Sequence, residues 1–426
     1  MPLMEAIMNK KELLQCYDYL APVLDYSGPI IKHGKGCYIY DIDGNKYLDL
    51  NCGQFCAIFG HSDEKAAEVI YKTAKNLMHL NTNTISDKML EAAKKIHDIC
   101  PEMNGRSIIL STGSEANECA LRYAKNMSGN KPGIISFDCG YHGLTHGTEG
   151  YSISRKWVKP QVKDSFAVTA PPIWEQNSKE DITIYIKEFE RIVSENKDII
   201  AAALFEPIVS SGGMYLPPKE YWREIRRICD ENGVYLIFDE CQTGFARTGS
   251  WFYYQQIDCI PDMLVCAKSI GLGLPVAMVI FNGNTIPKEK FTMHHFSSHQ
   301  NEPFAAALIS HAIEEVKNNN VLKKIQQDGK YFIEKLEILS GRYSSVMQKP
   351  HGIGLMCGFY LNIDGLNRQQ AEEQGKRFCN EALRNNIIIQ CTNYGRTIRL
   401  LPGYYITRAE IDFFVTALEK TLAEFV

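Results

Sequence analysis

Long hydrophobic runs are missing from this sequence of 426 residues. No apolar stretch approaches the roughly 18 residues that would suggest a membrane-spanning helix, so we expect no membrane partner. An excess of positive charge is missing as well, because the net charge is −4, and we therefore expect no nucleic-acid partner. The first 15 residues are amphipathic, include acids and lack the apolar stretch of a secretory signal, which favours a helical arm.

Cysteine pairs of the Cys-x-x-Cys type are also absent, although the chain has 14 cysteines. This scatter argues against a zinc site or a disulfide framework and favours free thiols in a reducing, cytoplasmic setting. The hydrophobic content of 45% and the charged content of 23% are ordinary for a globular protein. A chain of this length is expected to form more than one small core.

The pattern of apolar residues predicts an α/β fold. Residues 37–50 alternate and turn at Asp43-Gly44, which predicts a β-hairpin. From about residue 64 onward, helical stretches alternate with short apolar runs, which we predict to be strands at 107–110, 133–137, 199–205, 234–238 and 263–267. Continuous apolar strands separated by helices imply a mainly parallel sheet that is buried on both faces.

The last part of the chain is richer in helix. We predict helices at 305–318 and 321–339, strands at 354–361 and 397–401, and a final helix from Thr407, where Thr-Arg-Ala-Glu forms a capping box. The expected domains are an N-terminal arm with part of a small domain (1–60), a large domain (61–303) and a C-terminal small domain (304–426). The small domain is thus built from both chain ends.

Asp239 and Lys268 are the most informative pair of residues. Each closes a short apolar run, and the two are 29 positions apart. Ligands of parallel sheets bind at the carboxyl ends of the strands, where Glu206 also lies. Such a pair suits pyridoxal phosphate, because the lysine forms a Schiff base and the acid keeps the pyridine nitrogen protonated. Spacing alone also allows an ordinary turn-capping acid and a surface lysine.

Three neighbouring segments add to this hypothesis. Ser111 to Asn117 follows a predicted strand and opens a helix, where Gly113 and Ser114 could offer backbone N–H groups to a phosphate. Tyr141 lies at the end of another strand and could stack on a planar ring, although ordinary packing would explain it, and His142 beside it, equally well. Gln242 is three residues past the acid and could contact the phenolic oxygen of the cofactor.

The chain resembles the class III aminotransferases, which are fold-type I pyridoxal-phosphate enzymes. The matching segments occur in the family's order: STGSEANE (111–118), YHG (141–143), EPIVSSGG (206–213), FDECQTGFARTG (238–249), AKSIGLGLP (267–275) and TIRLLP (397–402). The resemblance implies a homodimer, or a tetramer of such dimers, with active sites at the subunit interface and with amino acid and 2-oxo acid substrates. Its implied site residues are Lys268 (Schiff base), Asp239 (pyridinium), Tyr141 and His142 (ring), Gln242 (O3′), Gly113, Ser114 and the neighbouring subunit's Ser298 (phosphate), and Arg399 (substrate carboxylate).

Two positions narrow the choice within the family. Many members that use glutamate have an acid five residues after the Glu of the Glu-Pro motif, where this chain has Ser211. Arg399 then lacks an internal acidic partner, so every substrate should bring a carboxylate. The segment 53–61 resembles 2,2-dialkylglycine decarboxylase, in which the residue equivalent to Gln54 binds the departing carboxylate. A neutral amide can hold that group without an ion pair that would stabilise the ground state, although Gln54 could also be an ordinary polar residue.

The same resemblance implies an alkali ion, K⁺ or Na⁺, near the active site. Its expected ligands are oxygen donors, which suit a hard cation, at Leu80, Thr82, Ser298, Gln300 and Glu302. We therefore expect a decarboxylating transaminase that passes the amino group to pyruvate or another 2-oxo acid. The alternatives are an ordinary class III aminotransferase for an ω-amino acid or amine and, on the same scaffold, a racemase, aminomutase or lyase.

Overall fold

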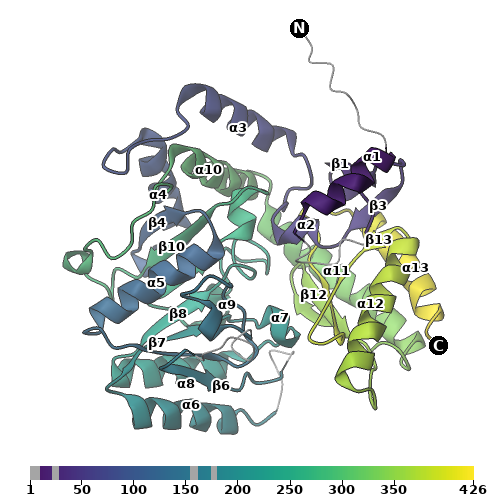
Figure 1. The fold of residues 1–426 in the computed structure, drawn as a ribbon. Coiled ribbons are helices and arrows are strands. Elements are labelled where there is room, and N and C mark those ends of the chain that lie inside the picture. The colour runs from purple at the N-terminus through teal and green to yellow at the C-terminus, as the bar shows by residue number, and fades with distance from the viewer. Residues whose placement is uncertain (1–9, 22–27, 154–161, 174–179) are drawn as a thin grey trace.

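A computed structural model describes residues 10–21, 28–153, 162–173 and 180–426. The expected N-terminal helical arm lies partly outside these residues, and its described part forms α1 (Lys10–Gln15), followed by the 3-10 helix η1 (Cys16–Tyr19). Figure 1 shows a large α/β part in purple to green and a smaller part where the purple and yellow ends of the chain lie together.

The large part is built on a seven-stranded sheet. Its strand order is β4 (Arg106–Leu110), β10 (Ala277–Phe281), β9 (Met263–Cys266), β8 (Tyr235–Asp239), β7 (Ile200–Phe205), β5 (Gly133–Phe137) and β6 (Ser165–Val168). Strand β10 runs antiparallel to both of its neighbours, and the other strand pairs are parallel. The five strands expected from the sequence are confirmed, whereas β6 and β10 were not predicted.

Helices cover both faces of this sheet. Successive strand residues point to opposite faces, so Ile237 belongs to the cluster that packs under α5 (Gly113–Met127). Phe238 points the other way and meets the ring of Trp222 with centroids 5.0 Å apart. The helices on that second side, all of which contribute to the larger core cluster, are α4 (Asp87–Ile99), α6 (Thr183–Asn196), α8 (Lys219–Asn232) and α10 (Pro303–Asn318). Helix α3 (Glu64–Asn76) lies against α10 (Figure 1).

The smaller part joins the two ends of the described chain. Strands β1 (Ile31–Lys35), β2 (Tyr38–Asp41) and β3 (Lys46–Asp49) form a sheet that β13 (Ile387–Ile388) extends in parallel. A second sheet has the order β11 (His351–Ile353), β12 (Met356–Tyr360), β15 (Thr397–Leu400) and β14 (Gln390–Thr392). Its helices are α11 (Val321–Arg342), α12 (Arg368–Arg384) and α13 (Arg408–Ala423), and α13 begins with the predicted capping box.

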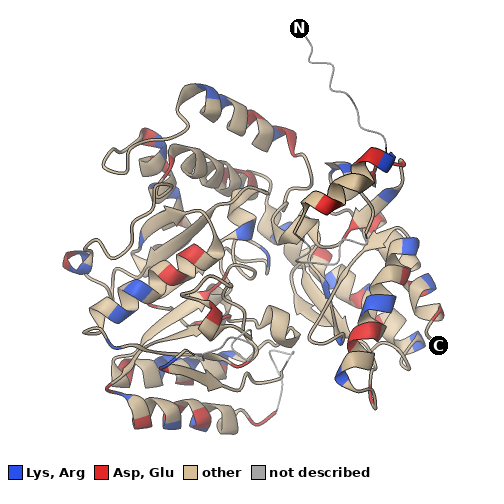
Figure 2. Ribbon diagram, viewed as in Figure 1, with Lys and Arg blue, Asp and Glu red and all other residues tan. Residues whose placement is uncertain are grey.

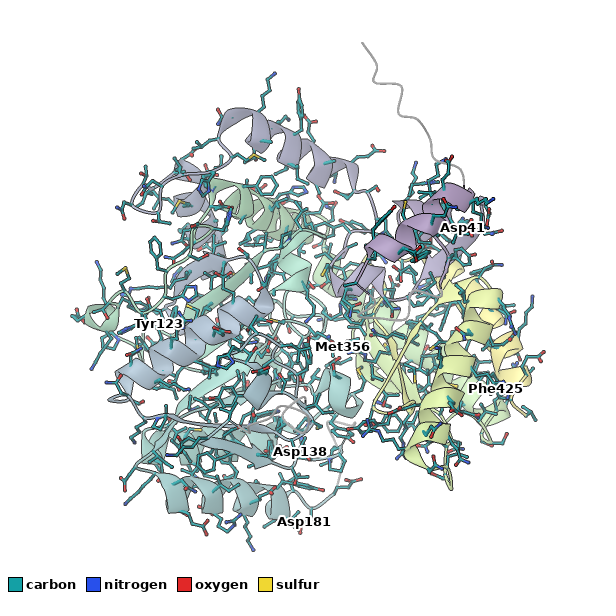
Figure 3. All side chains as sticks on the ribbon, in the orientation of Figure 1. Asp41, Tyr123, Asp138, Asp181, Met356 and Phe425 are labelled. Carbon is teal, nitrogen blue, oxygen red and sulfur yellow. The ribbon has the colours of Figure 1, made fainter. Side chains whose placement is uncertain are left out.

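Arg247 ties the two parts together. Its guanidinium is fully buried and donates to the carbonyl oxygens of Leu355, at 3.1 Å, and Pro402, at 2.6 Å. The charge also lies 4.6 Å from the centre of the Tyr404 ring. Figure 3 places Met356, the residue after Leu355, at this junction, and Asp41 and Phe425 on the far side of the smaller part. The bonds of one arginine therefore fix β15, and with it Arg399, relative to the large sheet.

Most charged side chains lie on the outside of the fold, whereas Arg247, Asp239 and Arg399 are buried. Figure 2 shows basic residues (blue) and acidic residues (red) interspersed along the outer helices, while the central strands are mostly tan. Strands β5, β7, β9 and β10 have only buried residues, as a sheet covered on both faces requires. Among the described residues, no helix combines the length and the apolar character needed to cross a membrane.

Candidate active site

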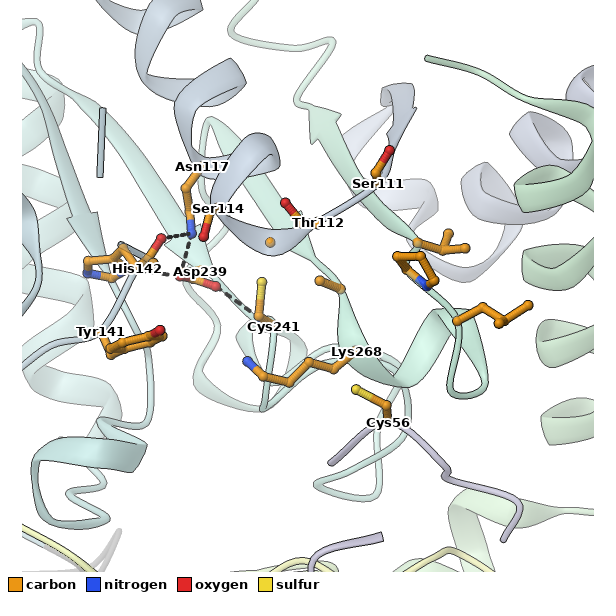
Figure 4. A pocket seen from close by; sticks show the side chains of 16 residues that line it. Cys56, Ser111, Thr112, Ser114, Asn117, Tyr141, His142, Asp239, Cys241 and Lys268 are labelled. Atoms are coloured by element: carbon orange, nitrogen blue, oxygen red, sulfur yellow. Dashed lines mark hydrogen bonds and ion pairs between the residues drawn. The ribbon is translucent and has the colours of Figure 1, made fainter. Parts of the chain in front are cut away.

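A cavity of about 250 Å³ opens at the carboxyl ends of the large sheet's strands. Figure 4 shows the acid, the lysine and the aromatic ring from the sequence hypothesis around this one space. Its walls come from five separate segments, and the lining residues are Cys56, Ser111, Thr112, Gly113, Ser114, Asn117, Tyr141, His142, Gly143, Asp239, Cys241, Ala267, Lys268, Leu274, Pro275 and Val276.

The start of α5 forms one end of the cavity. Thr112 caps the helix and accepts a hydrogen bond from the N–H of Glu115 at 3.3 Å, which leaves the first helical N–H groups, at Gly113 and Ser114, without an intrahelical partner. A Cβ on Gly113 would lie 3.0 Å from the Cys241 sulfur, so only glycine keeps this approach open. The positive end of a 15-residue helix and its free N–H groups suit a phosphate.

Asp239 lies at the floor of the cavity and is held as a carboxylate. It is only 4% exposed and accepts hydrogen bonds from Asn117 Nδ2 at 2.8 Å, His142 Nδ1 at 2.8 Å and the Cys241 N–H at 3.1 Å. Burial alone would raise its pKa, but His142, the Cys241 hydrogen bond and the charge of Lys268 outweigh burial and lower the pKa to about 2. An ionised acid is what a protonated pyridine nitrogen needs as a partner.

Lys268 follows β9 and starts the 3-10 helix η5 (Lys268–Gly271). Its φ of 50° is in the left-handed region, which is uncommon for a residue with a side chain and is typical of functional sites. Figure 4 shows its side chain extending across the cavity below Asp239 and Cys241, with the amine directed toward Tyr141. The expected lysine and acid therefore share one cavity, as the strand-end prediction requires.

Tyr141 and His142 form another wall. Tyr141 is 40% exposed, and its backbone N–H donates to Glu206 Oε1 at 2.8 Å. His142 is buried beside it, and its bond to Asp239 leaves its Nε2 without a partner among the described residues. Burial raises the pKa of Glu206, which closes β7, to about 7. An exposed ring over a charged floor can cover one face of a flat cofactor.

A chain of hydrogen bonds leads from Gln242, which follows the cavity-lining Cys241, to the predicted substrate arginine. The Ser210 hydroxyl donates to the amide oxygen of Gln242 and accepts from Arg399 Nη1 at 3.1 Å. Since the amide oxygen of Gln242 is occupied, its NH₂ group remains for a cofactor oxygen. The sequence pointed only to Ser211, whose hydroxyl also accepts from Arg399, at 3.3 Å. The double serine of the SSGG segment was the available signal for Ser210.

Arg399 and Gln54 lie outside the residues that line this cavity. Arg399 is 3% exposed, and burial lowers its pKa to about 10. Gln54 is exposed and lies within the short helix α2 (Cys52–Phe55), between the exposed Gly53 and the buried Phe55. Its neighbour Phe55 places its ring 4.9 Å from the Arg399 guanidinium, and the Cys56 thiol lines the cavity. The structure thus brings Gln54 beside the site without placing it in the cavity wall.

Of the residues expected to hold an alkali ion, Glu302 directly precedes α10. Its carboxylate oxygen accepts hydrogen bonds from His79 Nδ1 and, at 2.8 Å, from His299 Nδ1. The side-chain oxygen of Gln300 is buried and has no hydrogen-bond partner among the described residues. Ser298 is exposed, and Leu80 and Thr82 are half-buried. The unpartnered amide oxygen fits a hard cation, whereas the two imidazoles compete for the carboxylate.

The fold and the cavity define a fold-type I pyridoxal-phosphate enzyme, and comparisons with known proteins give its family. The class-III aminotransferase profile matches residues 25–422, so the chain belongs to this family. The acetylornithine aminotransferase of Methanocaldococcus jannaschii is 32% identical over 98% of this chain and 97% of its own length. The leucine/methionine racemase of Thermococcus litoralis is 27% identical over 98% of this chain and 96% of its own.

Solved structures agree with the family assignment. An amine transaminase from an uncultivated Pseudomonas species, solved in its PLP-bound form, has a TM-score of 0.85 and 25% identity, covering 95% of this chain and 98% of its own. The assignment makes the protein an aminotransferase-family enzyme for which pyridoxal phosphate is the expected cofactor. The finer resemblance to 2,2-dialkylglycine decarboxylase is not among these relationships and stays a prediction.

Proposed function

We propose that the protein is a pyridoxal-phosphate-dependent aminotransferase whose amino donor and 2-oxo acid acceptor both bring a carboxylate to Arg399. One observation carries this proposal: the hydroxyl groups of Ser210 and Ser211 contact the guanidinium where an acid could neutralise it. A buried arginine whose hydrogen-bond partners among the described residues are all neutral favours an anionic ligand, because an unpaired buried charge is costly.

Each residue of the site then has a defined task. Bound pyridoxal phosphate would supply the electron sink that weakens bonds at the substrate's α-carbon. Asp239 would keep the proton on the pyridine nitrogen, and the helix start at Gly113 and Ser114 would hold the phosphate. The Lys268 amine would bind the cofactor and move the proton of the substrate α-carbon. Tyr141 would exclude water from one face of the ring.

A donor screen tests this proposal. The purified yellow protein is mixed with pyruvate and either α-amino acids or amines that lack a carboxylate, and alanine formation is measured. We expect turnover only with the α-amino acids. Equal turnover of simple amines would contradict the proposal and favour an ω-amino acid or amine transaminase. Conversion of an amino acid without any 2-oxo acid would instead identify a racemase, aminomutase or lyase.

Decarboxylation of the donor is a second candidate, favoured by the position of Gln54. This amide directly precedes Phe55, which contacts Arg399, and Cys56, which lines the cavity. A neutral donor there could hold a carboxylate that is about to leave without stabilising its charge. A mixture of 2-aminoisobutyrate and pyruvate should then give acetone, CO₂ and alanine. If no CO₂ is released while alanine is transaminated well, the decarboxylating reaction is excluded.

Replacing Gln54 by alanine should separate the two reactions. We expect Gln54→Ala to slow CO₂ release from 2-aminoisobutyrate by about 10²-fold, the usual loss for one hydrogen-bond donor in an active site. The rate of amino transfer from alanine to a 2-oxo acid should change much less, because that reaction keeps its carboxylate on Arg399. The measurement compares both rates in one preparation, and equal losses would remove the assigned role.

The proposal includes a homodimer and a cation. In such a dimer, a second copy of the chain would cover the exposed Tyr141. Each copy would donate its exposed Ser298, which lies in the turn before α10, to the phosphate of the other copy. Sedimentation of the holoenzyme tests the dimer. Exchange of K⁺ or Na⁺ for Li⁺ tests the ion: a loss of activity that Glu302→Gln abolishes would support an ion at that carboxylate, and unchanged rates would exclude it.

A further inference from the structure

Arg399 is surrounded by neutral hydrogen-bond acceptors. Its Nη1 contacts the hydroxyls of Ser210 and Ser211, and its Nη2 donates to the amide oxygen of Gln390. Its Nε is buried and has no partner in the described part of the chain. The guanidinium also lies over the ring of Phe55. A fully buried cation is thus held in place by dipoles and a ring while one N–H group stays available.

Gln390 holds this arginine by a cross-strand contact. It lies on β14, where it is the direct antiparallel partner of Arg399 on β15, so the two side chains leave the sheet on the same face. The next residue, Cys391, packs so tightly on α12 that a Cβ at Gly375 would lie 2.7 Å from its sulfur. The register and this packing leave the amide of Gln390 facing Arg399.

We propose that Gln390 is a specificity-determining residue that orients Arg399 without neutralising it. The inference rests on the proposed function and adds the residue that sets the substrate class. An amide at this position orients the guanidinium and adds no negative charge beside it, so the positive charge stays available to the substrate. A carboxylate in the same place would form a charge-assisted pair with the arginine and would remove the need for a carboxylate on the substrate.

Gln390→Glu is the sharpest test, because it changes charge and hardly changes shape. The reaction of the holoenzyme with the amino donor alone is followed by the loss of the yellow band, so that the acceptor plays no part. We expect the second-order rate with an α-amino acid to fall by about 10²-fold, mainly through weaker binding, as expected for a lost charge-assisted contact. The rate with a primary amine that lacks a carboxylate should rise or stay constant.

Two further variants make the result specific. Gln369→Glu adds one negative charge on an exposed face of α12 and should leave both rates unchanged. Gln390→Met keeps the length of the side chain but removes the hydrogen-bond acceptor. The amino acid should therefore bind about tenfold more weakly, which corresponds to the free energy of about one hydrogen bond, and the rate with the amine should not rise. If Gln390→Glu does not fold, Gln390→Met still tests the role of Gln390.

The outcomes separate this inference from the proposed function. If the unchanged enzyme already reacts equally well with amines and amino acids, the proposed function fails. If it requires the carboxylate but Gln390→Glu leaves the ratio of the two rates within a factor of about three, the role of Gln390 is overturned while the function stands. An unchanged affinity in Gln390→Met would likewise overturn the orienting role.

Discussion

Lys268→Ala should lower the rate of amino transfer by roughly 10⁴-fold or more, the scale seen when a catalytic nucleophile is removed. The amine of Lys268 is the group in the cavity that can bind the cofactor's aldehyde and then move a proton at the substrate. The variant should bind pyridoxal phosphate through Gly113 and Ser114 but lack the yellow band of the lysine-bound cofactor. Single-turnover kinetics and absorbance spectra measure both effects.

A surface lysine provides the matched control. Lys65 lies on α3, is exposed, pairs with Glu315 at 2.9 Å and is not among the residues that line the cavity. Lys65→Ala should keep the yellow band and nearly all of the activity, because an exposed ion pair contributes little to stability. If Lys268→Ala kept the yellow band or a tenth of the activity, another amine would have to bind the cofactor.

The cofactor end of the site was largely predictable from sequence. Asp239 and Lys268 close apolar runs, and the carboxyl ends of parallel strands meet at one edge of a sheet, so two residues 29 positions apart could be placed in one cavity. The helix start at Gly113 was predictable for a similar reason, since a small residue after a strand and before a helix is a common phosphate site. Both predictions need only local sequence and the topology of the sheet.

The substrate end was less predictable because its contacts join distant parts of the chain. Arg399 was expected, but Gln390 was missed, since its importance comes from the register between β14 and β15, which no local pattern encodes. Ser210 on α7 (Ser210–Gly213) was missed because its contact with Arg399 spans 189 positions of the sequence. Asn117 was missed as well, because an amide on a helix gives no sign that it will reach Asp239. Strand β10 escaped prediction because its antiparallel insertion breaks the strand–helix alternation. The division at residues 60 and 303 stays a prediction.

These contacts put two charges of opposite sign at opposite ends of the site. Asp239 is kept negative by three donors, and Arg399 is kept positive by neutral acceptors. The hydrogen bonds from Arg399 through Ser210 reach Gln242, which lies three residues after Asp239. A substrate that carries both an amine and a carboxylate therefore matches the site, because its anionic end meets Arg399 while its amine lies near Lys268.

Asp239→Asn should lower the rate of amino transfer by about 10²-fold to 10³-fold, the range for removing one preorganised electrostatic group. The amide cannot hold a proton on the pyridine nitrogen, so the ring accepts electrons less well. Its NH₂ group would also face donors at Asn117, His142 and Cys241. Lys268 stays in place, so the variant should still bind the cofactor and turn yellow. Titration of the cofactor by absorbance and single-turnover rates give the two measurements.

Glu240, the acid next to Asp239, provides the matched control for Asp239→Asn. Glu240 is equally buried, and burial raises its pKa to about 7, but its carboxylate accepts from the N–H groups of Tyr253 and Tyr254, away from the cavity. Glu240→Gln makes the same chemical change one residue along and should lower the thermal midpoint while the rate per cofactor-bound site changes less than about threefold. Equal rate losses in the two variants would contradict this role. Asp239 would then support the fold and would not be the partner of the pyridine nitrogen.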